Sequence, residues 1–333
     1  GVGVVALTFV LVRRISTLRA AVVASLVVAC FPPLVANDTL TLTEPLALLL
    51  LLVVAITLDA RRPLWCGFAL GLLVLTRPNA YLVVAIVAFV LWRHVGWRLT
   101  LVAVAIAIAV VAPWIARNAV QVDTLKLTTS DGFTLAAIYG PAGRERGVFV
   151  DPVFDPAYDG AEFKVTALGP EGAWSDELTQ LAIDGVMEDP GYVVEVVGRN
   201  FLSYVELDPG LNEIAERIDG RDPGVRTVGL PIFYLVTVAG LAGLWVTRRE
   251  PRWWPMMAIV AQFALLSLLL VAPPRLRAPF DLLMCIGVGL LVQYLHERRQ
   301  RRAGDDHTGD EADTGADDVP DAPTAGTVAD QPI

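Results

Sequence analysis

The chain has 333 residues, of which 55% are hydrophobic and 18% are charged, and its formal net charge is −9. This apolar content, with a mean hydropathy of +0.56, excludes both an ordinary cytosolic enzyme and a disordered protein. The charge also divides by region: residues 1–117 and 228–302 hold 18 basic and 6 acidic residues, residues 118–227 hold 8 and 20, and residues 303–333 hold 9 acids and no base. This division predicts a polytopic membrane protein with one polar loop and a tail.

Nine apolar stretches predict membrane-spanning helices, because crossing a hydrocarbon core about 30 Å thick takes about 20 mostly apolar residues. We therefore expect an all-α membrane part of about nine spans, in domains 1–117 and 228–296. The first stretch is short, about 18 Å as a helix, and the chain opens on Gly1. We expect the sequence to begin within a helix whose upstream part is missing. The stretches are 1–12, 18–36, 46–58, 64–76, 79–92, 99–115, 228–246, 253–272 and 279–295.

Basic residues in the short turns predict the orientation in a plasma membrane. Most fall at alternate turns, which we place in the cytoplasm, so that residues 118–227 are extracytoplasmic and residues 297–333 cytoplasmic. One alternative stays open: residues 64–92 as a single helix would invert everything downstream. That helix would place Arg77 and Pro78 in mid-membrane, where a charge is costly, so the pattern favours two spans. The cytoplasmic residues are Arg13, Arg14, Arg61, Arg62, Arg93, Arg98, Arg248, Arg249, Arg252, Arg298, Arg299, Arg301 and Arg302.

The loop 118–227 predicts a mixed α/β extracytoplasmic domain. Short β-prone segments at 124–129 and 147–150 are separated by turn signals at 130–132 and 151–152. A helix capped by Ser175 follows and ends at 189–191. The next helix, 192–207, has a narrow polar stripe, so it is either buried against the spans or lies in the membrane interface with its stripe toward water. From Ala303 the acidic composition predicts disorder.

Cysteine and histidine spacing predicts neither disulfides nor a metal site. Cys30, Cys66 and Cys285 lie within apolar stretches, where small buried hydrophobes are expected, and the three histidines are far apart in sequence. We expect no certain cofactor, leave a divalent-metal requirement open, and expect no nucleic-acid partner.

Four arginines lie at the outer ends of the predicted spans, against the orientation rule. Arg275 and Arg277 stand between prolines before the last span, and Arg77 and Arg117 lie at the same depth. Several guanidinium groups there suit a lipid-anchored phosphate or pyrophosphate, because their geometry pairs phosphate oxygens two at a time. The alternative is that each arginine extends to lipid headgroups.

Two carboxylates lie beside the predicted span that starts at residue 46. Glu44 opens the helix, where the dipole stabilises a negative charge, and Asp38 precedes it. Their functional interpretation is a site that holds an arginine, a metal or a sugar hydroxyl.

Five segments, in this order along residues 1–296, resemble the GT-C membrane glycosyltransferases. They are 43–46 (TEPL), 71–78 (GLLVLTRP), 112–118 (APWIARN), 189–192 (DPGY) and 275–279 (RLRAP). The branch they are most similar to is the protein O-mannosyltransferase and aminoarabinose-transferase-like group.

The resemblance implies an enzyme that transfers a hexose or pentose from a polyprenyl-phosphate donor to an extracytoplasmic hydroxyl of a lipid, glycan or protein, with inversion. It implies a catalytic Asp in a first outer loop, upstream of Gly1, so that no catalytic residue lies in this chain and the chain alone is inactive. Arg275 and Arg277 would face the donor phosphate, helped by Arg77 or Arg117, and Glu44 and Asp38 would support the site.

Two other functions stay open. A transporter or flippase of lipid-linked sugars would show internal repeats with interrupted helices, and none is evident across the loop. A non-catalytic scaffold or sensor would use the loop as a binding module and would tolerate loss of Arg275 and Arg277.

Overall fold

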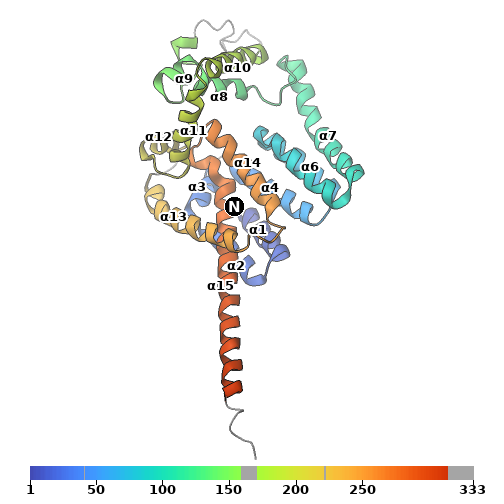
Figure 1. The fold of residues 1–333 in the computed structure, drawn as a ribbon. Coiled ribbons are helices and arrows are strands. Elements are labelled where there is room, and N and C mark those ends of the chain that lie inside the picture. Colours follow the sequence, from blue (N-terminus) through green and yellow to red (C-terminus); the bar gives the residue numbers. More distant parts are fainter. Residues whose placement is uncertain (41, 159–170, 221–222, 314–333) are drawn as a thin grey trace, which may run out of the picture.

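The computed structural model describes residues 1–40, 42–158, 171–220 and 223–313, and every regular element in them is a helix (Figure 1). The helices are α1 (Val2–Ile15), α2 (Leu18–Cys30), α3 (Pro32–Asp38), α4 (Glu44–Asp59), α5 (Pro63–Thr76), η1 (Pro78–Ala80), α6 (Tyr81–Val95), α7 (Trp97–Gln121), α8 (Ser130–Tyr139), α9 (Pro141–Arg146), η2 (Pro156–Tyr158), α10 (Glu171–Glu188), α11 (Gly191–Tyr204), α12 (Pro209–Asp219), α13 (Pro223–Val246), α14 (Trp254–Leu269), η3 (Pro274–Arg277) and α15 (Ala278–Asp313).

The prediction of about nine spans is wrong. In the described residues, four helices are long and apolar enough to cross a membrane, and the number rises to five if the bent pair α2 and α3 is one span. The four are Pro78–Val95, Trp97–Gln121, Gly224–Val246 and Pro274–Arg302. Apolar composition alone overcounted, because α5 and α14 have 14 and 16 residues and reach only about 21–24 Å, short of a core about 30 Å thick.

Prolines explain one bend within a predicted stretch and one break between two predicted stretches. Pro32 and Pro33 lie at the start of α3, which is bent by 60° from α2, so the stretch 18–36 is not one straight helix. Between α5 and α6 the helix stops at Thr76, Arg77 is extended, and Pro78 opens the short helix η1. The single long helix over 64–92, the alternative that the sequence left open, does not form.

The bundle is organised around α15. This helix packs against α2, α13 and α14, while α1, α4 and α5 pack in sequence beside α2, and α5 packs on α7. The fully buried residues of α15 include Leu282, Cys285 and Ile286, which sit in the main hydrophobic core. Cys66 is buried in the same core as a small apolar side chain, whereas Cys30 is exposed, and all three cysteines are free thiols.

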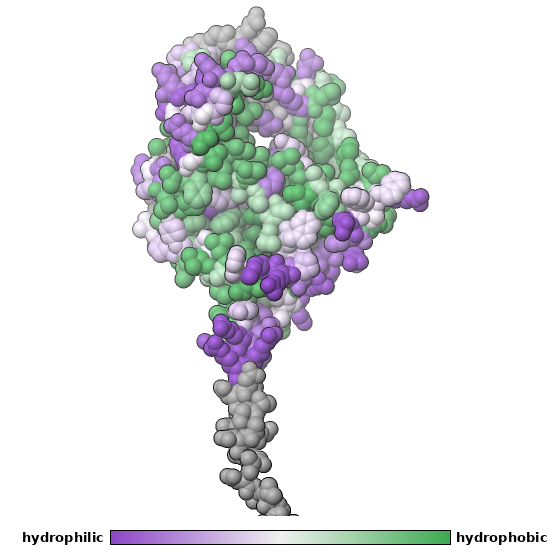
Figure 2. Space-filling model, viewed as in Figure 1, coloured by the Kyte–Doolittle hydropathy of each residue, from purple (hydrophilic) through white to green (hydrophobic). Residues whose placement is uncertain are grey.

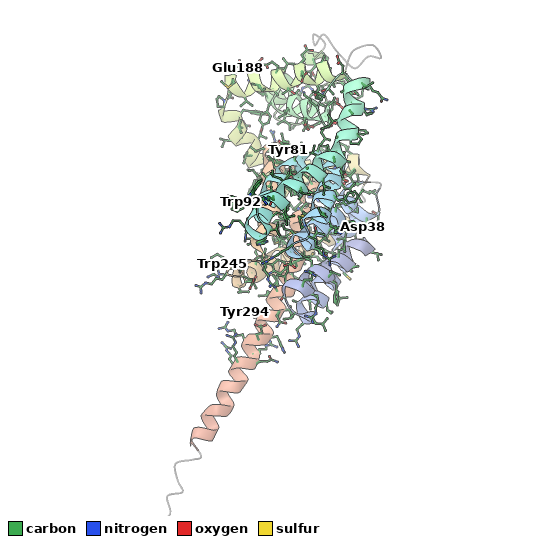
Figure 3. All side chains as sticks on the ribbon, turned by 90° about the vertical axis from the view of Figure 1, so that its right-hand side faces the viewer. Asp38, Tyr81, Trp92, Glu188, Trp245 and Tyr294 are labelled. Carbon is green, nitrogen blue, oxygen red and sulfur yellow. The ribbon has the colours of Figure 1, made fainter. Side chains whose placement is uncertain are left out.

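The surface is that of a multi-pass membrane protein. Figure 2 shows hydrophobic residues over the middle of the molecule, with hydrophilic residues at the loop end and where α15 leaves the bundle. Many large apolar side chains of the spans are exposed, such as Ile108, Leu235 and Val238. In Figure 3, Glu188 of the loop region lies at one end and Trp245 and Tyr294 lie toward the other. Exposed apolar residues on this scale are explained by contact with lipid.

The loop region is helical, so the predicted mixed α/β domain is wrong for the described residues. The segment predicted as a turn at 130–132 instead starts α8, and Gly132 serves close packing: a Cβ atom there would lie 2.1 Å from the backbone oxygen of Ser175. Ser175 does not cap its helix, because α10 already begins at Glu171 and Ser175 is fully buried. The predicted stop at 189–191 is confirmed, since α10 ends at Glu188.

A small hydrophobic cluster holds the loop region together, and hydrogen bonds from α11 dock it on the bundle. Trp174 and Leu178 of α10 pack with Ala136 of α8. Asn200 of α11 donates hydrogen bonds to the backbone oxygens of Leu268 and Leu270, both at 2.9 Å. These bonds satisfy carbonyl groups that the end of α14 leaves without helical partners.

Polar side chains are buried at the end of α11 and along α12. The polar stripe predicted on 192–207 points inward at its end, where Ser203 and Glu206 are buried. In α12, Asn212 and Glu216 are likewise buried, while the apolar Ile214 and Ile218 are exposed. Of the two alternatives for this stripe, burial is therefore the one observed for Ser203 and Glu206, and the buried polar groups require partners within the molecule.

The C-terminal part of α15 leaves the bundle as a long helix (Figure 1). The basic cluster Arg298–Arg302 lies within it, and the helix continues to Asp313, beyond Ala303, where composition predicted disorder. The rest of the predicted acidic tail, residues 314–333, lies outside the described residues.

Candidate functional site

The short helix η3 carries the two arginines that the sequence singled out. Prolines flank it: Pro273 precedes it, Pro274 opens it, and Pro279 lies in the first turn of α15. Proline fixes φ and removes a hydrogen-bond donor, so this segment is held in one conformation between α14 and α15. Arg275 and Arg277 leave this rigid segment toward two different sets of carboxylates.

Arg275 belongs to a cluster around Glu44. The Glu44 carboxylate, 3% exposed, accepts an ion pair from Arg77 at 2.7 Å, and the Nε atom of Arg275 lies 3.8 Å from it. Arg275 also pairs with Asp219 of α12 at 2.8 Å. The first turn of α4, the break after α5, the end of α12 and η3 therefore meet at one point, where Arg77, Arg275 and Glu44 lie together.

Arg277 belongs to a second cluster and is 1% exposed. It pairs with Asp281 at 2.9 Å and with Glu206 at 3.2 Å, and it donates a hydrogen bond to the backbone oxygen of Tyr204 at 2.8 Å. Its guanidinium carbon also lies 3.8 Å from the centre of the Phe233 ring. Burial, with the nearby Asp281 carboxylate, raises the pKa of the Tyr204 phenol, so this hydroxyl stays neutral.

A fourth arginine, Arg226, joins the second cluster from the start of α13. It pairs with Glu206 at 2.9 Å and with Glu216 at 3.5 Å. The side-chain amide of Asn212 also donates a hydrogen bond to the Glu206 carboxylate, at 2.8 Å. Glu206 is thus shared by Arg226, Arg277 and Asn212, which explains how a carboxylate can be buried in the connection between α11 and α12.

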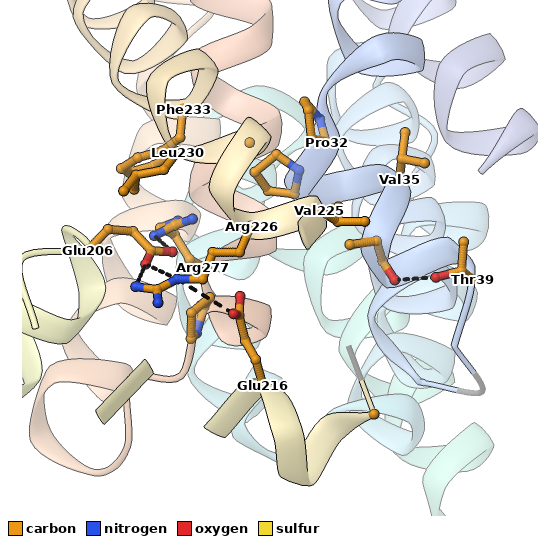
Figure 4. Close-up of a pocket in the computed structure, with 15 residues that line it drawn as sticks. Pro32, Val35, Thr39, Glu206, Glu216, Val225, Arg226, Leu230, Phe233 and Arg277 are labelled. Atoms are coloured by element: carbon orange, nitrogen blue, oxygen red, sulfur yellow. Dashed lines mark hydrogen bonds and ion pairs between the residues drawn. The ribbon is translucent and has the colours of Figure 1, made fainter. Parts of the chain in front are cut away.

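A pocket of about 220 Å³ opens beside this second cluster (Figure 4). Arg226, Arg277, Glu206 and Glu216 form its polar side. Its apolar side comes from α3 and α13 and includes Pro32, Pro33, Val35, Val225, Leu230 and Phe233. Helices α3 and α13 pack against each other and together form the apolar wall. The pocket therefore has one charged wall and one apolar wall, and the apolar wall suits a lipid chain.

The charges decide which groups are available to a ligand. In the part of the chain that the structure describes, the two clusters join four arginines to five carboxylates, namely Glu44, Glu206, Glu216, Asp219 and Asp281. An incoming anion must therefore displace a carboxylate from an arginine. Arg275 is the best placed for such an exchange, because its side chain is 34% exposed and its Nε atom lacks a hydrogen-bond partner.

Two predicted site residues lie elsewhere. Arg117, on α7, is exposed and contacts its own helix, with a hydrogen bond to Asn118 at 2.9 Å and its guanidinium over the Trp114 ring. Asp38 pairs with the amino group of Gly1 at 3.1 Å. Among the described residues, neither Arg117 nor Asp38 has an ion pair with a member of the Glu44 cluster.

Sequence reasoning missed Glu206, Glu216, Asp219, Arg226 and Asp281. A signal existed for two of them: Asp281 lies four residues after Arg277 in an apolar span, and Glu206 lies on the polar stripe of 192–207. The others come from a loop whose approach to the spans no local pattern encodes. No group of three or more Asp, Glu, His or Cys side chains in the described residues is placed to hold a metal ion.

Comparisons with protein-family models, with curated proteins and with solved structures gave no match for this chain.

Proposed function

We propose that this chain is part of a membrane glycosyltransferase that uses a polyprenyl-phosphate sugar as donor and a hydroxyl outside the membrane as acceptor. The observation that carries the proposal is the placement of Arg275, partly exposed on a proline-bounded helix, beside the buried Glu44–Arg77 pair. The GT-C resemblance assigns donor-phosphate binding to this same segment. In this proposal Arg77 is a further cation near the phosphate. Arg277, which the resemblance also assigns to the donor phosphate, is 1% exposed and already paired with Glu206 and Asp281.

The chemistry of the two clusters supports this assignment. A phosphate that replaces Asp219 or Glu44 on Arg275 forms charge-assisted hydrogen bonds of the same kind. As leaving group, the polyprenyl phosphate gains negative charge, and fixed cations stabilise it. The pocket beside Arg277 is smaller than the about 300–1,000 Å³ of sites for drug-sized ligands, so it suits a headgroup or the first isoprene units, with the remaining chain in the bilayer.

Donor binding is the direct test. The protein, reconstituted in nanodiscs, is titrated with radiolabelled polyprenyl phosphate and with the uncharged polyprenol of the same length. We expect the phosphate to bind and Arg275→Ala to weaken binding about ten- to a hundredfold, since hydrogen bonds to charged groups contribute about 1.5–3 kcal/mol. Arg275→Lys should retain part of the affinity. Arg98→Ala, which removes an exposed arginine of α7 at the predicted cytoplasmic end, is the matched control.

Equal binding of polyprenol and polyprenyl phosphate, or equal affinity in Arg275→Ala, contradicts the proposal. Because the resemblance places the catalytic Asp outside this chain, a transfer assay on the protein as the source cell makes it, in that cell's membranes, separates an enzyme from a flippase. Transfer of labelled sugar to an acceptor that is lost in Arg275→Ala supports the enzyme. Movement of the intact lipid-linked sugar across the vesicle membrane, without transfer to an acceptor, supports the transporter. The scaffold alternative predicts that neither activity depends on Arg275.

A further inference from the structure

Four segments with basic residues meet at the end of the bundle opposite the loop region. Arg14 at the end of α1, Arg61 after α4, His94 at the end of α6 and Arg252 before α14 line one cavity of about 760 Å³. In the sequence these residues served only to predict orientation. The structure brings them together because α1 packs on α4 and α6 packs on α14.

The rim and the wall of this cavity differ in chemistry. The basic side chains at the rim are exposed. The wall is apolar and largely buried, and Trp253 forms part of it at 2% exposure, with Trp254 beside it at the surface. Other apolar lining residues include Leu11, Leu58, Val90, Met256 and Ile259. A charged rim over an apolar wall, with tryptophan at the boundary, matches an amphipathic ligand at the membrane interface.

The rim has an unbalanced positive charge. Arg14 is already paired, since its Nε atom lies 3.0 Å from the Asp59 carboxylate. Among the described residues, the side chains of Arg61 and Arg252 make neither an ion pair nor a hydrogen bond. Two exposed cations at one cavity attract an anion, and basic pockets between membrane helices bind anionic headgroups.

We propose that this cavity binds an anionic phospholipid, with its phosphate held by Arg61 and Arg252 and an acyl chain along the apolar wall. Inorganic phosphate would use only the rim, whereas the lined volume far exceeds what a phosphate ion needs. This site is separate from the Glu44 and Arg277 clusters, and it does not depend on the proposed function.

The test measures lipid binding to the whole chain in detergent by native mass spectrometry, with phosphatidylglycerol and phosphatidylcholine of identical acyl chains. We expect selective binding of phosphatidylglycerol, weakened about tenfold or more in the double variant Arg61→Gln, Arg252→Gln. Arg98→Gln with Arg248→Gln removes the same charge from exposed positions outside the cavity and should leave binding unchanged. Size-exclusion elution checks that both double variants stay folded.

A gain-of-affinity variant tests the same site in the other direction. Asp59→Asn removes the partner of Arg14 and should tighten phosphatidylglycerol binding about threefold, a change that damage to the fold does not produce. Equal binding of the two lipids, equal loss in the Arg98 and Arg248 control, or no tightening in Asp59→Asn overturns the proposal. Displacement of the lipid by millimolar inorganic phosphate also overturns it, because that result indicates a simple anion site.

Discussion

Arg275 and Arg277 are separated by one residue, yet their side chains have different surroundings. Arg277 is 1% exposed and is held by two carboxylates, a backbone oxygen and the Phe233 ring, whereas Arg275 is 34% exposed. A buried cation with all its partners in place contributes to the folded state, and its loss leaves carboxylates in a medium where charge is costly. Arg275 has one short ion pair, with Asp219 at 2.8 Å, and a longer contact with Glu44 at 3.8 Å. Because it is partly exposed, it can exchange a carboxylate for another anion more readily than Arg277, so the two arginines call for different experiments.

Arg277→Ala is expected to lower the free energy of unfolding by about 3–5 kcal/mol, because Asp281 and Glu206 lose their shared cation. Thermal or denaturant unfolding in detergent measures the change. The double variant Arg277→Met, Asp281→Leu removes the charge pair together and should be less destabilised than Arg277→Met alone. Arg248→Ala, at an exposed arginine that stacks on Trp245, is the control and should shift stability by less than about 1 kcal/mol. Equal stability of Arg277→Ala and the wild type contradicts a role for Arg277 in the fold.

At the scale of elements, glycine determines how closely two of the long helices approach. A Cβ atom at Gly243 of α13 would lie 1.8 Å from the backbone oxygen of Gly287 of α15, and one at Gly287 would lie 2.3 Å from that of Gly240. These contacts involve backbone atoms, which cannot rotate away. Small residues at helix contacts are the usual means of close approach within membranes, where no hydrophobic force drives helices together.

Gly243→Ala is therefore expected to separate α13 from α15 and to destabilise the protein by about 1–3 kcal/mol. The matched control is Gly198→Ala in α11, where an added Cβ meets no described atom beyond its chain neighbours and its own helix backbone within 4 Å, and where alanine should be neutral or slightly stabilising. Unfolding of both variants in the same detergent gives the comparison. An equal melting temperature for Gly243→Ala and Gly198→Ala means that α13 and α15 are not in the close contact described.

At the scale of the whole molecule, the loop region and the exit of α15 lie at opposite ends of the bundle (Figures 1 and 3). Basic residues gather at the turns at the end of the bundle where α15 leaves it, and the Arg298–Arg302 cluster lies there too. The loop region at the other end is acidic. The orientation rule assigns the basic side to the cytoplasm, so the loop should face out.

Single-cysteine labelling tests this orientation. Glu188→Cys, in the loop region, and Arg299→Cys, in α15, are introduced into a background with Cys30, Cys66 and Cys285 changed to Ala. A membrane-impermeant maleimide should label residue 188 in intact cells and residue 299 only after lysis. Both positions are exposed in the structure, so access depends on the side of the membrane. The unmodified triple-Ala background, which should not be labelled, is the control, and the opposite pattern reverses the orientation.

The sequence by itself determined the class of this protein, because apolar content and charge distribution depend on composition rather than on packing. It also located the helix break at Arg77–Pro78, since proline acts on the backbone of its own segment. It missed the bend at Pro32, because residues 18–36 were predicted as one span. It did not determine the number of spans, because an apolar stretch has the same composition whether its helix crosses the bilayer or ends short of it. It overestimated strand in the loop, where the β-prone segment 124–129 found no partner strand in the described residues and is irregular, between α7 and α8.

Tertiary structure alone decided which charges meet. Glu44, Arg77, Asp219 and Arg275 come from four elements far apart in the chain, and no spacing rule relates them. The buried side of the 192–207 stripe and the cavity lined by Arg61 and Arg252 likewise depend on which helices pack together. Burial and ion pairing act between elements, so they become visible only when the helices are assembled.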